Sequence, residues 1–340
     1  MSANLITHKI EFSVFGRGYD DDRGNSGSGA KEPDHISYGV NSACFDTTGR
    51  YCWVSLSSSG MMIGLRKLDV ETMTFVDQGN IPRVNNIYHP VNVDNNWGVC
   101  FSDNTTYIFD LTTNEIIYQI SDSKFGNTTA NISVTLDEES NILRFAYVEK
   151  ASDNKYRQIF SYDIDNDSWS EVGWWDRACV GFIDVNSAYM HYYPVWFSSY
   201  YQAGSLNASG GTDWWVTAGI SHKFDNLGGA MWGLVGRGKL FIPSYVDGAW
   251  VMGEYDASSA PDFLTPSPVA TFGQFNGWVE IDTFTCYTPE WTWGAFGCAE
   301  GTFIADMVNR EMYKISDSRL TPRAISEDRM ICSNGDIYYL

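Results

Sequence analysis

The stretch of sequence that decides the fold is Phe-Asp-Leu-Thr-Thr-Asn-Glu-Ile-Ile-Tyr, which runs from Phe109 to Tyr118. Its two ends have the aromatic and β-branched composition of strands. Its polar middle, from Thr112 to Glu115, is typical of a tight turn. Asp110 stands where the first strand would end, and there its carboxylate can accept hydrogen bonds from N–H groups that the turn leaves unpaired. The stretch therefore predicts two antiparallel strands joined by a turn that an aspartate stabilises.

The same order of an apolar residue, an aspartate and a polar turn recurs along the chain. The shared aspartates are Asp69, Asp110, Asp163, Asp256 and Asp306. The interval from Asp163 to Asp256 is the longest, at roughly twice the others, which indicates that one copy between them has lost the pattern. With that copy counted, the period is about 47 residues, the length of a four-stranded β-propeller blade. A chain of 340 residues then holds about seven units.

Each unit is expected to contain four strands. The first three units predict strands at residues 41–46, 51–55, 62–69 and 73–76, then 88–93, 97–102, 107–111 and 115–120, then 131–136, 142–149, 156–164 and 169–172. These runs are rich in Val, Ile, Tyr, Phe, Trp and Thr, and Gly, Asn, Asp and Ser separate them. No long stretch shows the apolar spacing of a helix.

The two ends of the chain are expected to share one unit. Residues 330–340 resemble residues 43–53 at the start of the first unit, so they predict two strands of a further unit. The run from Leu5 to Phe15 is one more strand with no partner nearby in the sequence. Pairing it beside the C-terminal strands would close a ring of seven units and leave no open sheet edge. Six blades would result if the C-terminal strands pack elsewhere.

On these repeats the whole chain resembles the β-propeller superfamily. The resemblance implies an all-β fold and a single β-propeller domain over residues 1–340, with seven blades of four antiparallel strands. The chain lacks the regular Gly-His and Trp-Asp dipeptides of WD40 repeats, the double glycines of kelch repeats and a set of sialidase-type Asp boxes. Two regions depart from the repeat. Residues 16–34 predict a long exposed loop, and residues 179–222 predict an irregular blade rich in aromatic residues.

The charge of the chain restricts its partners. Its formal net charge is −20, which would repel phosphate backbones and anionic membrane surfaces. No apolar run approaches the roughly 18 to 20 residues of a membrane-spanning helix. Residues Met1 to Lys9 lack a basic segment followed by an apolar one, so they do not predict a secretory signal. We therefore expect synthesis in the cytoplasm, no sequence-specific nucleic-acid binding and no membrane insertion.

Cysteine and histidine usage predicts neither a metal site nor a cofactor. The seven cysteines are Cys44, Cys52, Cys100, Cys179, Cys286, Cys298 and Cys332, and no two form a CxxC pair. Their odd number and apolar neighbours predict buried free thiols in a reducing compartment. The five histidines include no HxxxH or HExxH arrangement.

Consecutive aromatic residues are concentrated between residues 174 and 215. Neighbours in a strand point to opposite faces, so an adjacent pair cannot face one core. The rings are then either packed between blades around an ordered insertion, or partly exposed and covered by a partner protein or a glycan. The candidate partner-binding residues are Trp174, Trp175, Tyr192, Tyr193, Trp196, Tyr200, Tyr201, Trp214 and Trp215.

Carboxylates offer weaker candidates. Asp163, Asp165 and Asp167 alternate as in calcium loops, but Ser168 replaces the glycine of the EF-hand and Trp174 replaces its final glutamate. A solvated blade turn is the favoured interpretation of this segment, and also of the acidic run 20–22. Propeller glycosidases carry separated carboxylates around a central funnel. Any acidic propeller offers such residues, here Asp34, Asp46, Asp94, Asp184, Asp225 and Glu280.

The sequence favours a protein without catalytic activity. It contains no GxSxG elbow and no P-loop. We expect a structural or interaction component of a larger assembly, with other proteins of an oligomeric ring as partners. The nozzle and hub propellers of short-tailed phage virions are similar at the level of fold. The alternative is a propeller that binds carbohydrate or resembles glycoside hydrolases.

Overall fold

The computed structural model describes residues 9–10, 39–58, 61–84, 86–90, 96–102, 104–121, 132–147, 158–174, 178–184, 187–192, 200–205, 233–256, 268–277, 279 and 281–340. Within these ranges the regular structure is entirely β-strand. A search of the same residues finds no helix with the length and apolar character needed to cross a membrane. The loop predicted at residues 16–34 lies outside them.

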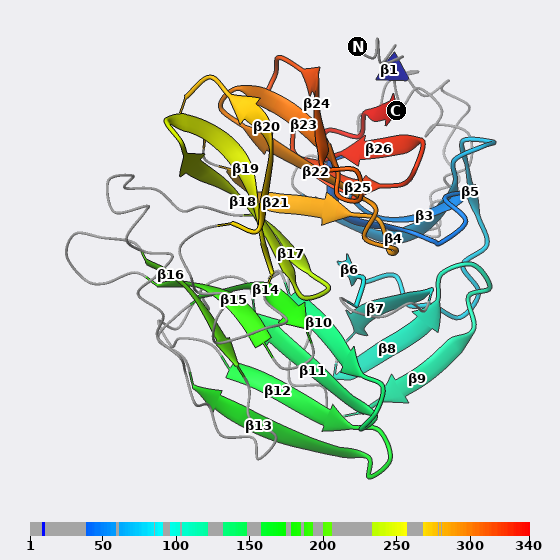
Figure 1. Cartoon of the computed structure of the whole chain (residues 1–340). Coiled ribbons are helices and arrows are strands. Elements are labelled where there is room, and N and C mark those ends of the chain that lie inside the picture. Colours follow the sequence, from blue (N-terminus) through cyan, green and yellow to red (C-terminus); the bar gives the residue numbers. More distant parts are fainter. Residues whose placement is uncertain are drawn as a thin grey trace. The chain divides into compact units, whose positions relative to one another are not determined.

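The described strands form antiparallel sheets in which neighbours in the sheet are neighbours in the chain, apart from β1 (Figure 1). Among the described residues, six sheets have four strands and one has three. The chain divides into two compact units. Unit 1 contains residues 1–87, 96–128 and 322–340, and unit 2 contains residues 88–95 and 129–321.

Unit 1 is built on three sheets. The first contains β2 (Gly39–Phe45), β3 (Tyr51–Ser58), β4 (Met61–Asp69) and β5 (Thr74–Val76). The second contains β6 (Ile87–Tyr88), whose last residue belongs to unit 2, then β7 (Trp97–Ser102), β8 (Thr105–Asp110) and β9 (Ile116–Ile120). The third contains β25 (Pro322–Ile325), β26 (Arg329–Cys332), β27 (Ile337–Tyr339) and β1 (Lys9–Ile10).

Unit 2 contains the remaining sheets. One is formed by β10 (Ile132–Asp137), β11 (Ile142–Tyr147), β12 (Gln158–Asp163) and β13 (Ser168–Trp174), and the three-stranded sheet by β14 (Ala178–Asp184), β15 (Ser187–Tyr192) and β16 (Tyr200–Ser205). The last two are formed by β17 (Leu234–Gly236), β18 (Lys239–Val246), β19 (Ala249–Asp256) and β20 (Ala270–Phe275), and by β21 (Ile281–Tyr287), β22 (Trp293–Cys298), β23 (Gly301–Asp306) and β24 (Glu311–Ser316).

Eleven of the twelve strands predicted for the first three repeats are confirmed, because each overlaps an observed strand, whereas the strand predicted at residues 88–93 shares only Tyr88 with β6. The N-terminal run also pairs with the C-terminal strands as expected. Lys9 lies opposite Tyr338 and Ile10 opposite Ile337. Figure 1 shows β1 beside the C-terminal end of the chain. β1 therefore forms the edge strand of the sheet that contains β25, β26 and β27.

The repeated aspartates form the predicted turns. The carboxylate of Asp110 accepts hydrogen bonds from the backbone N–H groups of Thr112 and Thr113, at 2.9 and 2.6 Å. Three others, Asp69, Asp163 and Asp306, also accept from N–H groups two or three residues further on. Their role as turn-formers is confirmed at these four positions. The turn after Asp256 lies outside the described residues.

The residue four positions after each of these aspartates has a left-handed backbone although none is a glycine. The φ angle is 55° at Met73, 67° at Asn114, 47° at Asp167 and 57° at Arg310. This conformation costs a non-glycine residue about 1–2 kcal/mol. Asn114 and Asp167 are of the types that tolerate this conformation, whereas at Met73 and Arg310 the paired strands and the aspartate impose it.

Buried apolar side chains join the sheets of unit 1. One cluster connects Leu68 of the first sheet with Ile331 of the third. Another connects the first sheet with the second, and its centre is Trp53. The Trp53 ring packs edge-on against Phe109, with the ring centroids 4.8 Å apart. Its Nε1 donates to the carbonyl oxygen of Leu111 at 2.8 Å, so this fully buried indole has no unpaired polar atom.

A buried lysine adds a polar link between the first two sheets. Lys67 of β4 is 3% exposed, and its Nζ donates to the carbonyl oxygen of Thr112 and, at 2.6 Å, to Oδ1 of Asn114. The ammonium also lies 4.3 Å from the centroid of the Tyr51 ring, within cation–π range. Burial lowers the pKa of Lys67, and three nearby aspartates oppose that shift.

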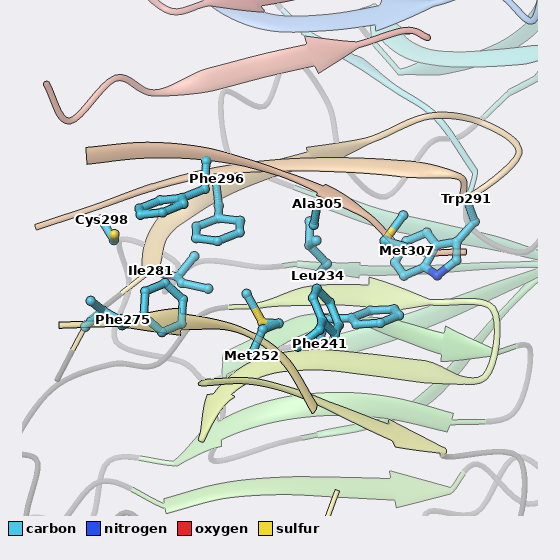
Figure 2. Close-up of a cluster of buried hydrophobic side chains, with 13 residues drawn as sticks. Leu234, Phe241, Met252, Phe275, Ile281, Trp291, Phe296, Cys298, Ala305 and Met307 are labelled. Atoms are coloured by element: carbon cyan, nitrogen blue, oxygen red, sulfur yellow. The ribbon is translucent and has the colours of Figure 1, made fainter. Parts of the chain in front are cut away.

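The core of unit 2 lies between the β17–β20 and β21–β24 sheets. It includes Leu234, Phe241, Phe296 and Ala305, all buried. Figure 2 shows Trp291 at one end of this cluster and Cys298 toward the other. The sheets approach closely because Gly294 has no side chain. A Cβ atom at Gly294 would lie 2.4 Å from Cδ1 of Leu234.

A buried carboxylate links the same two sheets. The side chain of Glu254 in β19 is 2% exposed and lies between two cations. Lys239 donates to it at 2.8 Å and Arg310, from the β23–β24 turn, at 2.6 Å. Burial raises the pKa of Glu254, but the hydrogen bonds from Arg310 and Lys239 outweigh burial and leave the pKa below its usual value.

Candidate functional site

Part of the aromatic segment lies in the β14–β16 sheet. Tyr192 ends β15, and Tyr200 and Tyr201 begin β16. Tyr192 pairs with Tyr200, and His191 pairs with Tyr201. Opposite residues share a face and neighbours alternate, so aromatic positions occur on both faces of this hairpin. Trp174 is the last residue of β13, in the preceding sheet.

The remaining candidates, Trp175, Tyr193, Trp196, Trp214 and Trp215, lie outside the described residues. The partner-binding role of all nine therefore stays a prediction. The irregular blade expected at residues 179–222 stays a prediction, and the pairing of β14 with β15 contains register shifts like those in several other sheets. The register shifts between Cys179 and Gly181 and again between Phe182 and Asp184. In contrast, β15 and β16 pair without interruption.

Among the carboxylates considered for a central funnel, the structure describes the side chain of Asp46 alone. It is 1% exposed and accepts hydrogen bonds from Oγ1 of Thr48, the N–H of Tyr51 and Oγ1 of Thr112, at 2.8, 3.1 and 2.7 Å. These bonds hold the β2–β3 hairpin against the next sheet, which is a structural role. Asp184 ends β14, and Asp34, Asp94, Asp225 and Glu280 lie outside the described residues.

The acidic turn at residues 163–167 does not gather its carboxylates. Asp163 accepts from the side chain and backbone of Asn166, and these bonds lower its pKa. Asp165 accepts from an asparagine in the β10–β11 turn, and Asp167 from the hydroxyl of Tyr162. Each carboxylate thus holds a different donor. In the part of the chain that the structure describes, no group of three or more His, Cys, Asp or Glu residues is placed to hold a metal ion.

The prediction of buried free thiols is confirmed for six cysteines, namely Cys44, Cys52, Cys100, Cys286, Cys298 and Cys332. Burial raises the pKa of the thiols of Cys44, Cys100 and Cys298, and it raises that of Cys332 to about 12. Thiols with such values stay protonated at neutral pH, and the protonated form is a poor nucleophile.

A different group of polar residues in unit 2 involves the β17–β18 and β21–β22 turns. His89 follows β6, Arg237 lies in the β17–β18 turn, and Pro289 and Trp291 lie in the β21–β22 turn. Nη2 of Arg237 donates to the carbonyl oxygen of Pro289 at 3.0 Å. Burial lowers the pKa of His89 to about 4, with a contribution from the nearby positive charge of Arg237. We call His89, Arg237 and Trp291 the turn site.

Two buried polar atoms of the turn site lack hydrogen-bond partners. These are Nε2 of His89 and Nε1 of Trp291. The other ring nitrogen of His89, Nδ1, lies 2.6 Å from the carbonyl oxygen of Pro90. Leaving a buried polar group unpaired costs about 1–3 kcal/mol, and over 90% of buried backbone polar groups in proteins are paired. Each of these two unpaired atoms is therefore an unusual feature of unit 2.

The backbone at the turn site is also strained. Trp291 has a φ of 61° and Arg237 a φ of 53°. In the β2–β3 hairpin the equivalent of Trp291 is Gly49, because the N–H of each donates to the carbonyl three residues earlier, at 2.9 and 3.0 Å. A large aromatic residue thus occupies a conformation that favours glycine. Sequence patterns gave no sign of this site, and a tryptophan at a glycine position of the repeat is the signal that could have revealed it.

Apolar side chains are exposed elsewhere on unit 2. Tyr245, Val269 and Val308 are 50%, 63% and 65% exposed. The N–H of Val269 donates to the carbonyl oxygen of Glu254 at 2.8 Å, and Val308 stands two residues before Arg310.

Comparison with known proteins identifies the fold. Neither a scan against protein-family models nor a search of curated proteins finds a match. Among solved structures, the β-propeller domain of Cps50 (Swd1) from Myceliophteria thermophila is 8% identical with a TM-score of 0.52, over 98% of this chain and 99% of that one. Uncharacterized protein lmo1340 from Listeria monocytogenes EGD-e is 10% identical with a TM-score of 0.51, over 89% and 94% of the two chains.

These likenesses extend over most of both chains at low sequence identity, so they establish the fold alone. Together with the four-stranded antiparallel sheets they show that the chain is all-β and has a β-propeller fold. The resemblance drawn from the repeats is confirmed at this level.

Proposed function

We propose that this chain is a non-catalytic β-propeller of seven blades that serves as a structural and interaction component of a larger assembly. The sheets of the described residues support the blade number. The pairing of β1 with β27 supports closure of the ring by the two chain ends. By analogy of fold, the assembly is a virion tail of the nozzle or hub type, in which the chain would form a ring with copies of itself or with other tail proteins.

The observation that carries the proposal is the pairing of aromatic positions across β15 and β16. Tyr192 opposes Tyr200 on one face, and Tyr201 lies on the other. Tyrosine and tryptophan are enriched in protein interfaces, and paired aromatic positions of this kind would suit a partner surface.

The polar groups of the described residues are consistent with a scaffold. The carboxylates of Asp46 and Glu254 and those of the four described turn aspartates accept hydrogen bonds within the fold. The net charge of −20 would also keep nucleic acid from adhering to a channel wall.

The test is the assembly state of the purified full chain and its place in particles from the native source. Size-exclusion chromatography with light scattering is expected to show a ring or a complex, and cross-linking with mass spectrometry to place residues 187–205 at the contact. The double variant Tyr192→Ala/Tyr200→Ala should lose assembly. The exposed Tyr245→Ala, in another sheet, is the matched control and should retain it.

A chain that stays monomeric and is missing from the purified particles would overturn the proposal. Turnover of any substrate on a panel of chromogenic glycosides would overturn its non-catalytic part. Glycan binding without turnover that Tyr192→Ala/Tyr200→Ala abolishes would assign the aromatic hairpin to sugar recognition in place of protein contact.

A further inference from the structure

The pair Asn276-Gly277 carries an inference that is independent of the proposed assembly role. Such a pair can modify itself, because the backbone nitrogen of the glycine can attack Cγ of the asparagine. The bond from Cγ to the side-chain nitrogen then breaks and ammonia leaves. Water opens the resulting succinimide ring to give aspartate or isoaspartate. The attacking nitrogen must lose a proton and the leaving nitrogen must gain one, so a group that contacts both nitrogens can assist both transfers.

The structure places such a group at Asn276-Gly277. Nδ2 of Asn276 donates to Oε2 of Glu300 at 3.0 Å, and the backbone N–H of Gly277 donates to Oε1 of the same side chain at 3.1 Å. Glu300 lies in the turn between β22 and β23. One carboxylate therefore contacts both the nucleophile and the leaving group. It can accept the proton of Gly277 and return a proton to Nδ2, so it is unchanged at the end of the step.

Buried residues hold the bend at residues 276–277 in place. Phe275 is 2% exposed and Val279 is fully buried, and both belong to the core cluster of unit 2. Figure 2 shows Phe275 and Cys298 toward the same end of this cluster, and Glu300 stands two residues after Cys298. The core on both sides of the bend thus keeps it beside the turn that carries the carboxylate.

The bend itself leaves room for the reaction. A Cβ atom at Gly277 would meet nothing within 4 Å, so no neighbouring group blocks the rotation that brings its nitrogen to Cγ. Asn276 is exposed, so water can reach the ring that forms. Both residues lie beyond the end of β20, outside the strand ladder.

The other Asn-Gly pair of the chain, Asn334-Gly335, has a different arrangement. The N–H of Gly335 donates to the carbonyl oxygen of Cys332 at 2.9 Å, and a carbonyl oxygen is too weak a base to remove an amide proton. Nδ2 of Asn334 donates to Oδ2 of Asp336 at 2.8 Å. Here the observed carboxylate contact reaches the leaving nitrogen and not the nucleophile. This pair therefore serves as a control within the same chain.

We propose that Asn276-Gly277 is a self-modifying site, at which Glu300 promotes the conversion of Asn276 to aspartate or isoaspartate. Water is the one reactant that the chain does not supply, and ammonia is the product released. The new carboxylate at position 276 lies against Glu300. Because the two like charges repel and the side chain no longer donates, the reaction breaks the link between the end of β20 and the β22–β23 turn.

The test follows both asparagines in the full chain at pH 7 by peptide mapping and mass spectrometry, which detects the exchange of the amide nitrogen for oxygen. A parallel incubation in urea gives the rate that the local sequence alone produces at each site. Folding is expected to raise the rate at Asn276, relative to that at Asn334, by about tenfold or more, since a positioned acid–base group contributes at least that much.

Glu300→Gln keeps the shape and an acceptor but cannot take up the proton, so it should slow the reaction at Asn276 about tenfold. Glu290→Gln removes the same charge from the exposed part of the β21–β22 turn and is the matched control, with no expected change. Gly277→Ala has room for its methyl group and should also slow the reaction, because the side chain hinders ring closure.

The proposal is overturned if folding does not raise the rate at Asn276 relative to that at Asn334. It is also overturned if Glu300→Gln reacts as fast as the wild type or faster, because the two hydrogen bonds would then protect Asn276. If Glu300→Gln does not fold, the comparison of the two asparagines in the wild type decides alone.

Discussion

Arg310 donates a hydrogen bond to Glu254 at 2.6 Å and so joins two sheets of unit 2. Arg310 stands four residues after the turn aspartate Asp306, and Glu254 stands two residues before the turn aspartate Asp256. Lys67 and Asn114 hold the same two positions of the repeat in unit 1, also 2.6 Å apart. The repeat therefore keeps a link between the third strand of one sheet and the left-handed turn residue of the next. The chemistry of the link changes from an ion pair to a hydrogen bond between a lysine and an asparagine.

The first prediction concerns Glu254. Glu254→Ala leaves Lys239 and Arg310 without their shared partner and should lower the free energy of unfolding by about 2–3 kcal/mol, less than for a fully buried pair because both cations are partly exposed. Glu254→Gln keeps the shape and one acceptor and should cost about half as much. Urea denaturation at pH 7 measures both.

The same residue predicts a pH dependence. Folding lowers the pKa of Glu254, so its stabilisation is complete above the ordinary value of 4.5 and is lost as the pH falls through the lowered value. If Glu254→Ala and the wild type lose stability in parallel below pH 4.5, the ion pair does not act as described.

The second prediction is a coupling between Lys67 and Asn114. In a double-mutant cycle of Lys67→Met with Asn114→Gly, the coupling energy should be about 1.5–3 kcal/mol, the range for a hydrogen bond that involves a charged group. Glycine at position 114 also relieves the left-handed backbone strain, but this effect is the same in both proteins that carry Asn114→Gly. The cycle therefore cancels it and leaves the energy of the hydrogen bond. Lys67→Met combined with Asn334→Gly, whose side chain bonds to Asp336, should be additive. Equal coupling in both cycles would show that the measured term is not the hydrogen bond.

The third prediction tests the turn aspartates. Asp306 accepts from the N–H groups of Val308 and Asn309 at 3.0 and 2.8 Å and is 7% exposed. Asp306→Ala removes this acceptor and should cost about 1–2 kcal/mol, as for the loss of a helix cap. Asp306→Asn keeps the Oδ1 acceptor and should cost less than about 0.5 kcal/mol. Thermal unfolding of the wild type and the two variants measures these losses. If Asp306→Asn loses as much stability as Asp306→Ala, the negative charge of Asp306 is responsible and not its Oδ1 acceptor.

The strands and turns were predictable because their determinants are local. Asp110 accepts hydrogen bonds from N–H groups two and three residues away, so residues close to it in the sequence determine its turn. Alternation of apolar residues along each strand is equally local. The pairing of β1 with β27 was predictable for another reason. The C-terminal unit of the repeat lacked a strand and the N-terminal strand lacked a partner, so each supplied what the other needed.

The links and the turn site were not predictable, because they depend on residues brought together by the fold. Glu254 and Arg310 are distant in sequence, and their relationship becomes visible only once both turns are aligned in space. His89 carries no motif, and its importance comes from an Nε2 atom that is buried without a partner. Burial of one atom is a property of packing, which composition and periodicity do not specify. The aromatic hairpin was found from the sequence, but its contact partner stays a prediction.

The fourth prediction separates backbone conformation from packing at two glycines. Gly248 has a φ of 85° in the β18–β19 turn, and a Cβ there would meet nothing within 4 Å. Gly248→Ala should therefore cost about 1 kcal/mol through conformation alone. Gly277 is equally open and has no positive φ, so Gly277→Ala should be neutral or stabilise by up to about 1 kcal/mol. Chemical denaturation checks the difference, and equal losses at both sites would refute it.

The last prediction is the acid response of His89. Its pKa is lowered from 6.5 to about 4 in the folded protein, so the unfolded chain binds this proton more readily. Stability should therefore fall as the pH drops from about 6.5 to 4, by about 1–3 kcal/mol for this residue, and the loss should persist below pH 4. The nearby Arg237 strengthens the effect because it repels the imidazolium. His89→Asn has no titrating group at this position, so the difference in unfolding free energy between it and the wild type isolates the histidine from every carboxylate. A difference that stays constant from pH 7 to pH 4 would show that the imidazole is not buried as a neutral acceptor.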